Sequence, residues 1–286
     1  MRAGTSGRRR LLAAAAGALL VLPAASALAQ TTDSGSSLSA RLHPLAHAAV
    51  LLLGEQHDAP DHQRLAAEVV QTLTHTGHLA SLVMEMLPVG RSSAAVRPVA
   101  DSEEIRQALA WDDRAWPWSA YGAIVRAAVR AGVPVLGGDL PRERLRLSMN
   151  RSELDQRLSP SALARQMELM REGHCKLLPE SQILPMARMQ IARDISLADT
   201  CAQAARAARP GQTVLLICGS VHADKALGVP QHLPADLTSR SVRLIGRGVD
   251  PADGQFDALW LTEPAPASDH CAALREQFKN RPAARP

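Results

Sequence analysis

The chain has 286 residues and a formal net charge of +4 at pH 7, from 32 basic and 28 acidic residues. Four of the arginines lie in residues 1–29, which contain no acid, so the remaining 257 residues carry 28 charges of each sign. This balance gives no electrostatic reason to expect a nucleic acid as partner, and the length suffices for one large core.

Residues 1–29 have the three parts of a secretory signal peptide. Arginines 8–10 form the basic region, residues 11–22 are apolar, and Ala27-Leu28-Ala29 is a small-residue cleavage site. The adjacent arginines also suit a twin-arginine signal. The apolar stretch is too short for a good transmembrane helix, and no cysteine offers a lipid anchor. We therefore expect a periplasmic or secreted protein with no stable membrane anchor.

After a linker at residues 30–44, short apolar runs alternate with helical patterns as far as residue 262. Helices are predicted at about 61–77, 103–110 and 119–131, where Asp61 suits the first N-cap and Gly77 and Gly132 suit the helix ends. Strands are predicted at 50–53, 81–86, 133–136, 213–218, 242–245 and 258–261. This rhythm predicts an α/β domain over 45–262, with a mainly parallel sheet flanked by helices.

The connection between the third and fourth predicted strands is longer than a crossover needs. Residues 141–208 contain several helical patterns, including a long one at 181–207, and five methionines. Methionine suits an adaptable apolar lining as well as core packing. We expect a helical cap inserted over one edge of the sheet, and a C-terminal extension at 263–286.

Ionisable residues lie in the last residues of four of the predicted strands or just after them, at the ends where a parallel sheet binds ligands. They come from two Gly-x-x-His motifs, from one glutamate and from one aspartate: Gly54 to His57, Glu85, Asp139, and Gly219 to His222. His57 with Glu85 can act as a general base with an orienting partner. His57, Glu85 and His222 can instead hold a divalent metal with one open position. The alternative is that these groups only cap buried strand ends.

Other polar groups have two open interpretations each. Tyr121, close to three tryptophans, either anchors its helix or belongs to an aromatic wall for a large flat ligand. Arg193 and Asp194 on the long cap helix either form a surface ion pair or reach the sheet edge. His174, in the predicted cap, either faces the sheet edge or points away from it.

Four cysteines in an exported chain allow two disulfides in three pairings. Cys201 and Cys218 lie in helical and apolar stretches and suit buried thiols. Cys175 and Cys271 lie in irregular segments, so this pair is favoured if any disulfide forms; the alternative is no disulfide.

The residues from Leu51 to His62 resemble the opening motif of the ChaN-like haem-binding proteins. Further matches follow in order along residues 45–262: Glu85, Trp116-Pro117-Trp118, Tyr121, Gln190-Ile191-Ala192-Arg193-Asp194, Gly219-Ser220-Val221-His222 and Gly228-Val229-Pro230. The chain differs from the usual pattern at Ser220, where asparagine is more common, and at Leu197, where methionine is more usual.

The resemblance implies a haem-binding protein of the superfamily that includes the Tiki, TraB and erythromycin esterase proteins. It implies Glu55, His57, Glu85 and His222 as the site residues, haem or another small molecule as the ligand, and a role in haem or iron uptake. Tyr121 and His174 are the candidate haem ligands, because a haem iron takes an axial His, Tyr, Cys or Met. The resemblance also allows a homodimer. Its hydrolytic relatives imply the alternative, an ester or peptide hydrolase at the same site, metal-assisted or based on His and Glu.

Overall fold

The computed structural model describes residues 1, 37–249, 254–267 and 269–279. The expected signal peptide therefore lies, apart from Met1, outside the described residues. Six parallel strands form one sheet in the order β3-β2-β4-β1-β5-β6. They are β1 (Val50–Glu55), β2 (Leu79–Pro88), β3 (Val135–Asp139), β4 (Thr213–Gly219), β5 (Ser239–Gly246) and β6 (Ala258–Thr262). The predicted α/β class and the six strands are confirmed.

The strands are apolar because the sheet is covered on both faces. All six residues of β1 are buried, and so are the first six of β4. The prediction for β3 began too early, at residue 133. Pro134 has no backbone N–H to donate to a ladder, although its carbonyl still accepts from the Leu82 N–H, and the strand begins at Val135.

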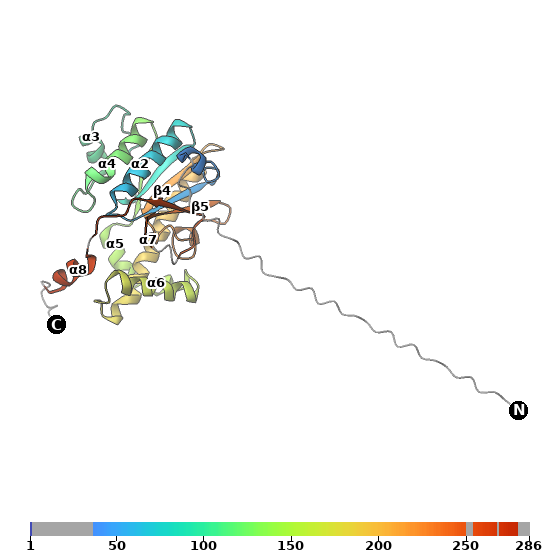
Figure 1. The fold of residues 1–286 in the computed structure, drawn as a ribbon, viewed down its shortest axis with the longest axis vertical. Helices are drawn as coiled ribbons and strands as arrows, with labels where there is room; N and C mark the ends of the chain where they lie inside the picture. The colour runs from blue at the N-terminus through green and yellow to red at the C-terminus, as the bar shows by residue number, and fades with distance from the viewer. Residues whose placement is uncertain (2–36, 250–253, 268, 280–286) are drawn as a thin grey trace.

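Helices cover the two faces of the sheet unequally (Figure 1). On one face, α2 (Pro60–His75) and α4 (Trp118–Arg130) pack over Leu51 and Leu53, together with α1 (Leu38–Leu42) and α3 (Ser102–Leu109). On the other face, α7 (Glu180–Ala207) contributes Leu197 and Cys201 to the layer over Val50 and Leu52. None of the described helices is long and apolar enough to cross a membrane.

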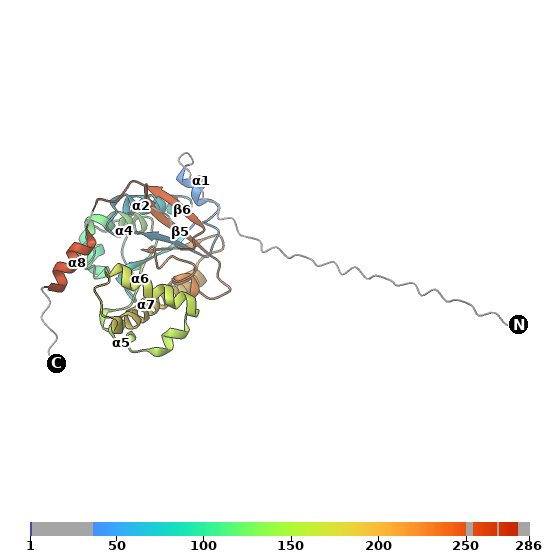
Figure 2. The same cartoon turned by 60° about the horizontal axis from the view of Figure 1, so that its bottom comes forward.

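The predicted helical insertion contains α5 (Arg142–Ser148), a 3₁₀ turn at Ser152–Gln156, α6 (Pro160–Gly173) and α7. Only part of it is a cap, because the second half of α7 is the crossover helix that packs on the sheet. The first half of α7 packs against α6 through two apolar clusters of their own. We use "cap" below for α5, the 3₁₀ turn, α6 and this first half of α7, which lie together in Figure 2.

A last helix, α8 (His270–Lys279), follows β6 in the segment where the sequence indicated only an extension. A disulfide joins Cys271 of α8 to Cys175 after α6, with the two Cα atoms 5.7 Å apart. This is the pair that the cysteine pattern favours. Cys201 and Cys218 are buried free thiols.

Gly137 in β3 is required by close backbone packing. A Cβ atom there would lie 2.0 Å from the carbonyl oxygen of Pro88, so we expect Gly137→Ala to lower the free energy of unfolding by about 1–3 kcal/mol. The control is Gly173→Ala, since a Cβ atom at that helical position meets nothing within 4 Å. Urea unfolding of both variants measures the difference, and equal midpoints would contradict the packing argument.

Candidate functional site

The two Gly-x-x-His motifs leave adjacent strands in register. Gly54 of β1 lies beside Cys218 of β4, and Glu55 lies beside Gly219. A Cβ atom on Gly54 would approach Ser220 Cα to 2.9 Å. The two loops after these strands are therefore in close contact, which brings His57 and His222 to the same edge, called the rim below.

Glu55 is the centre of the first group of polar side chains. Its carboxylate is buried, with 1% of the residue exposed, and accepts a hydrogen bond of 2.7 Å from the Tyr121 hydroxyl. His57 Nδ1 lies 3.0 Å from the same oxygen, and Gln63 Nε2 donates to the other oxygen at 2.9 Å. Three partners thus satisfy a buried anion, which would otherwise be costly.

Glu85 of β2 is the centre of the second group. It accepts a hydrogen bond of 2.8 Å from the Gly219 backbone N–H. Its oxygens lie 3.4 Å from His222 Nε2, 3.5 Å from Arg193 Nη1 and 3.8 Å from His57 Nε2. Burial alone would raise the pKa of Glu85, but the charges of His222, His57 and Arg193 hold it well below its usual range. Glu85 is therefore a fixed anion that links the two histidines.

His222 lies between two carboxylates. Its Nδ1 atom is 2.6 Å from Asp194 Oδ1, and its other ring nitrogen faces Glu85. Burial lowers the pKa of His222, but the charges of Glu85 and Asp194 outweigh this and raise the pKa to about 10. Burial raises the pKa of Asp194 to about 6. His222 is thus an imidazolium at neutral pH.

Arg193 and Asp194 both reach the rim, which resolves the choice that helix spacing left open. Arg193 Nε donates to Asp139 Oδ1 at 2.9 Å, at the end of β3. Burial raises the pKa of Asp139 although Arg193 acts in the opposite direction. Asp194 is 2% exposed. The neighbouring pair therefore connects α7 to three strand ends instead of forming a surface ion pair.

His57 is the more accessible histidine of the rim. Its side chain is 36% exposed, and its ring packs edge-on against Trp116 with 4.8 Å between ring centroids. Burial lowers the pKa of His57, but the hydrogen bond with Glu55 and the charges of Glu85 and Glu55 raise it overall. His57 also borders a groove of about 770 Å³ between α2 and α4, whose walls include Pro60, Pro117 and Ala120.

Sequence reasoning missed one supporting residue, Gln63, and left a second, His62, open between a place at the rim and exposure to solvent. Gln63 holds Glu55, as described above. His62 is buried, with its ring nitrogens 2.9 Å from the Gln56 N–H and 3.0 Å from Thr262 Oγ1, so it joins the first loop to β6. Both lie on the first turn of α2, and no local pattern distinguishes such an inward-facing turn from an exposed one.

The divalent metal site expected on His57, Glu85 and His222 is not supported. Among the described residues, no three His, Cys, Asp or Glu side chains are grouped so that they could hold a metal ion. The physical reason is that each nitrogen of His222 faces a different carboxylate, and one nitrogen of His57 faces Glu55. These side chains bind one another.

The two candidate haem ligands have different surroundings. Tyr121 is 1% exposed and donates to Glu55, while burial and the charge of Glu55 raise the pKa of its phenol above the usual range. His174 is half-buried in the turn after α6, and its Nδ1 atom lies 2.9 Å from the Met170 carbonyl oxygen. The Tyr121 hydroxyl is thus occupied by its hydrogen bond to Glu55 at the rim, whereas His174 lies in the cap.

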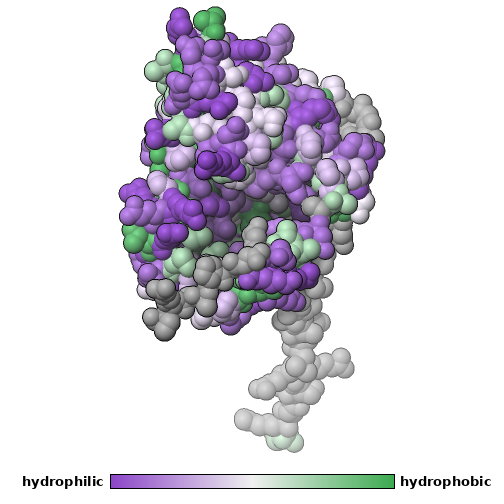
Figure 3. All heavy atoms as spheres, turned by 90° about the vertical axis from the view of Figure 1, so that its left-hand side faces the viewer, coloured by the Kyte–Doolittle hydropathy of each residue, from purple (hydrophilic) through white to green (hydrophobic). Residues whose placement is uncertain are grey.

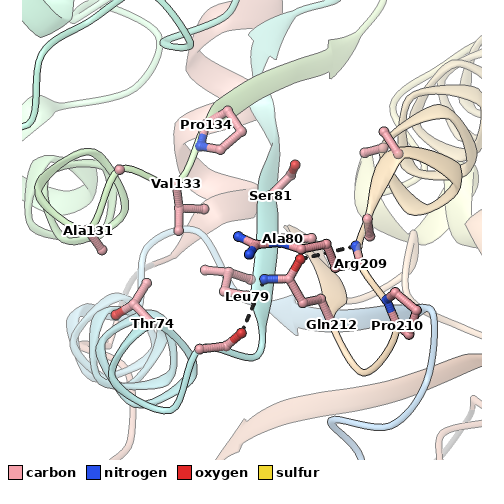
Figure 4. Close-up of a pocket in the computed structure, with 15 residues that line it drawn as sticks. Thr74, Leu79, Ala80, Ser81, Ala131, Val133, Pro134, Arg209, Pro210 and Gln212 are labelled. Carbon is pink, nitrogen blue, oxygen red and sulfur yellow. Dashed lines mark hydrogen bonds between the residues drawn. The ribbon is translucent and has the colours of Figure 1, made fainter.

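The opposite edge of the sheet carries a hollow of about 690 Å³ (Figure 4). It lies among the C-terminal ends of α2, α4 and α7, and Arg209 and Gln212 line it. Gln212 accepts from the Arg209 N–H and donates to the Gly77 carbonyl. Helix C-termini carry partial negative charge, which the Arg209 cation offsets. The hollow lacks the grouped ionisable side chains of the rim, so the rim is the candidate site.

Figure 3 shows the side of the molecule on which α8 lies. The face is hollowed near its middle, with hydrophobic residues visible in the depth of the hollow and hydrophilic residues along its upper border. A polar border around an apolar depth is typical of small-molecule sites.

The fold and rim define an α/β protein with a charged site at the carboxyl ends of its parallel strands, covered by a helical cap. The chain belongs to the family described as haem-binding uptake, Tiki superfamily, ChaN, whose model matches residues 42–233.

The chain is also similar to proteins of known structure. ChaN of Campylobacter jejuni, described with cofacial haem binding, is 20% identical with a TM-score of 0.66, and the match covers 80% of this chain and 93% of that one. An erythromycin esterase, EreC, in its open conformation is 13% identical with a TM-score of 0.46, over 84% of this chain and 82% of that one. No curated protein matched the chain in the sequence comparison.

Proposed function

We propose that this protein is an exported haem-binding protein that serves haem or iron acquisition. The observation that carries the proposal is membership of the ChaN family over residues 42–233. The fold shared with the Campylobacter jejuni protein, whose description names cofacial haem, supports it. Haem is the ligand that the protein would bind, and the iron of the haem is what the cell would gain.

The residues of the site suit haem binding better than they suit catalysis of a hydrolysis. A haem needs apolar walls and an axial donor. The cap contains partly buried leucines and methionines that pack around Met170, whose carbonyl oxygen contacts His174. A hydrolase would need a base at the rim. His222, whose pKa is raised to about 10, is already protonated at neutral pH, and the raised pKa of His57 acts in the same direction. The rim therefore favours haem binding over hydrolysis.

Titration of the mature protein with hemin tests the proposal. We expect a saturable shift of the Soret band at micromolar concentration, with a stoichiometry of about one haem per chain. Sedimentation velocity with and without hemin tests whether haem joins two chains in a homodimer. A spectrum that stays the sum of free hemin and protein would sink the proposal. Localisation is tested separately, by fractionating cells that express the full chain.

A further inference from the structure

The turn between α6 and α7 contains an imidazole in the arrangement that metal-binding histidines use. His174 Nδ1 lies 2.9 Å from the Met170 carbonyl oxygen, which can only accept, so Nδ1 carries the proton. The lone pair of the ring is then on Nε2, for which no hydrogen-bond partner is found among the described residues. Histidine ligands to metals commonly have their second nitrogen bonded to a carbonyl or carboxylate in this way.

The residue that His174 contacts belongs to an apolar cluster of the cap. Met170, whose carbonyl accepts the bond, belongs to a buried cluster with Ile183 and Ala187. Leu163, Met167, Leu169, Leu178 and Met186 pack against that cluster and are partly buried. Methionine side chains adapt to irregular ligands more readily than branched side chains do. Tyr121 has neither feature, because its hydroxyl is bonded to Glu55 and it is buried under the rim.

The turn is held in an unfavourable backbone conformation. Cys175 and Lys176 have φ values of +55° and +57°, in the left-handed region that residues with a Cβ atom rarely adopt. Their backbone N–H groups donate to the carbonyls of Glu172 and Arg171. Such a turn persists only where the surroundings hold it.

Two contacts from α8 supply that support. The disulfide joins Cys271 to Cys175, the residue after His174. One residue earlier, His270 Nε2 lies 3.1 Å from the carbonyl oxygen of Gly173, the residue before His174. Helix α8 thus holds the backbone on both sides of His174, and it lies beside the cap in both ribbon views (Figures 1 and 2).

We propose that His174 is the axial ligand of the haem iron, and that the Cys175–Cys271 disulfide and His270 are positioning residues that fix its turn. The assignment rests on the proposed function.

The positioning role of the disulfide has a redox consequence. A dithiol reductant would transfer two electrons and two protons to the disulfide and become a disulfide itself, leaving two protein thiols. The turn would then lose one of its two supports, and haem would bind more weakly.

Spectroscopy of His174→Ala tests the ligand. We expect hemin to bind at least tenfold more weakly with an altered Soret band, and added imidazole to restore the wild-type band by filling the space of the missing side chain. His75→Ala, at an exposed position on α2, is the matched control and should keep the wild-type spectrum. An unchanged band in His174→Ala, or a change that appears in Tyr121→Phe instead, overturns the assignment.

The positioning role is tested with the Cys175→Ser/Cys271→Ser double variant and with wild-type protein reduced by a dithiol. We expect hemin affinity to fall severalfold in both, with a Soret band like that of the wild type once saturated, since the ligand is retained. Circular dichroism checks that the fold is intact. Equal affinity in the oxidised and reduced proteins rejects the positioning role. If oxidised wild-type protein binds no hemin, the proposed function itself fails.

Discussion

Replacing His222 with alanine is expected to lower the free energy of unfolding at pH 7 by about 3–5 kcal/mol, the range measured when one partner of a buried ion pair is removed. His222 is 7% exposed and lies between Asp194 and Glu85, which are 2% and 3% exposed. Without the imidazolium, the two buried carboxylates lose the positive charge that lies between them and stabilises both. Chemical denaturation at pH 7 measures the effect.

A double-mutant cycle shows whether the loss comes from this charge arrangement or from the empty space. We expect Asp194→Asn in the His222→Ala background to cost much less than it does alone, because a neutral amide needs no counter-charge. His75→Ala is again the control and should stay within about 0.5 kcal/mol of the wild type. A cost below 1 kcal/mol for His222→Ala would mean that the histidine is not a charged partner in the folded protein.

The positions of Glu85 and His222 could be predicted from the sequence because each residue follows or ends a short apolar strand. Parallel strands place their carboxyl ends at one edge, so strand order is not needed to bring these groups together. The prediction failed at the metal, because it counted donors without knowing which of them bind one another. Glu55 shows why, since its partner Tyr121 lies 66 residues away.

Arg193 and Asp194 could not be placed from helix spacing. Both faces of a long helix in an insertion are polar enough to meet solvent, and the sequence does not reveal which half packs on the sheet. Leu197 and Ala198 lie in the layer over the sheet, so the preceding turn points at the strand ends.

Helix α8 was missed for a related reason. It is a short and largely exposed helix, and it is joined to the cap by a disulfide that spans 96 residues.

The protein is expected to become less stable as the pH rises above 6.5, and this is the second large effect. An unfolded chain loses the His222 proton near pH 6.5, whereas the folded chain keeps it to about pH 10. A group with a raised pKa in the folded state contributes fully below its unfolded pKa, and the contribution disappears as the pH approaches the folded value. The expected slope is about 1.4 kcal/mol per pH unit.

Urea unfolding between pH 6.5 and 8.5 is the cleanest measurement of this slope. His57, whose pKa is also raised, acts in the same direction at the start of this range. Burial raises the pKa of Cys201 and Cys218, so their unfolded thiols add to the slope only near pH 9 and above. His222→Gln should flatten the slope, since it has no proton to lose. Should that variant not fold, NMR titration of the His222 ring in the wild type decides the matter, because a midpoint near 6.5 contradicts the buried imidazolium.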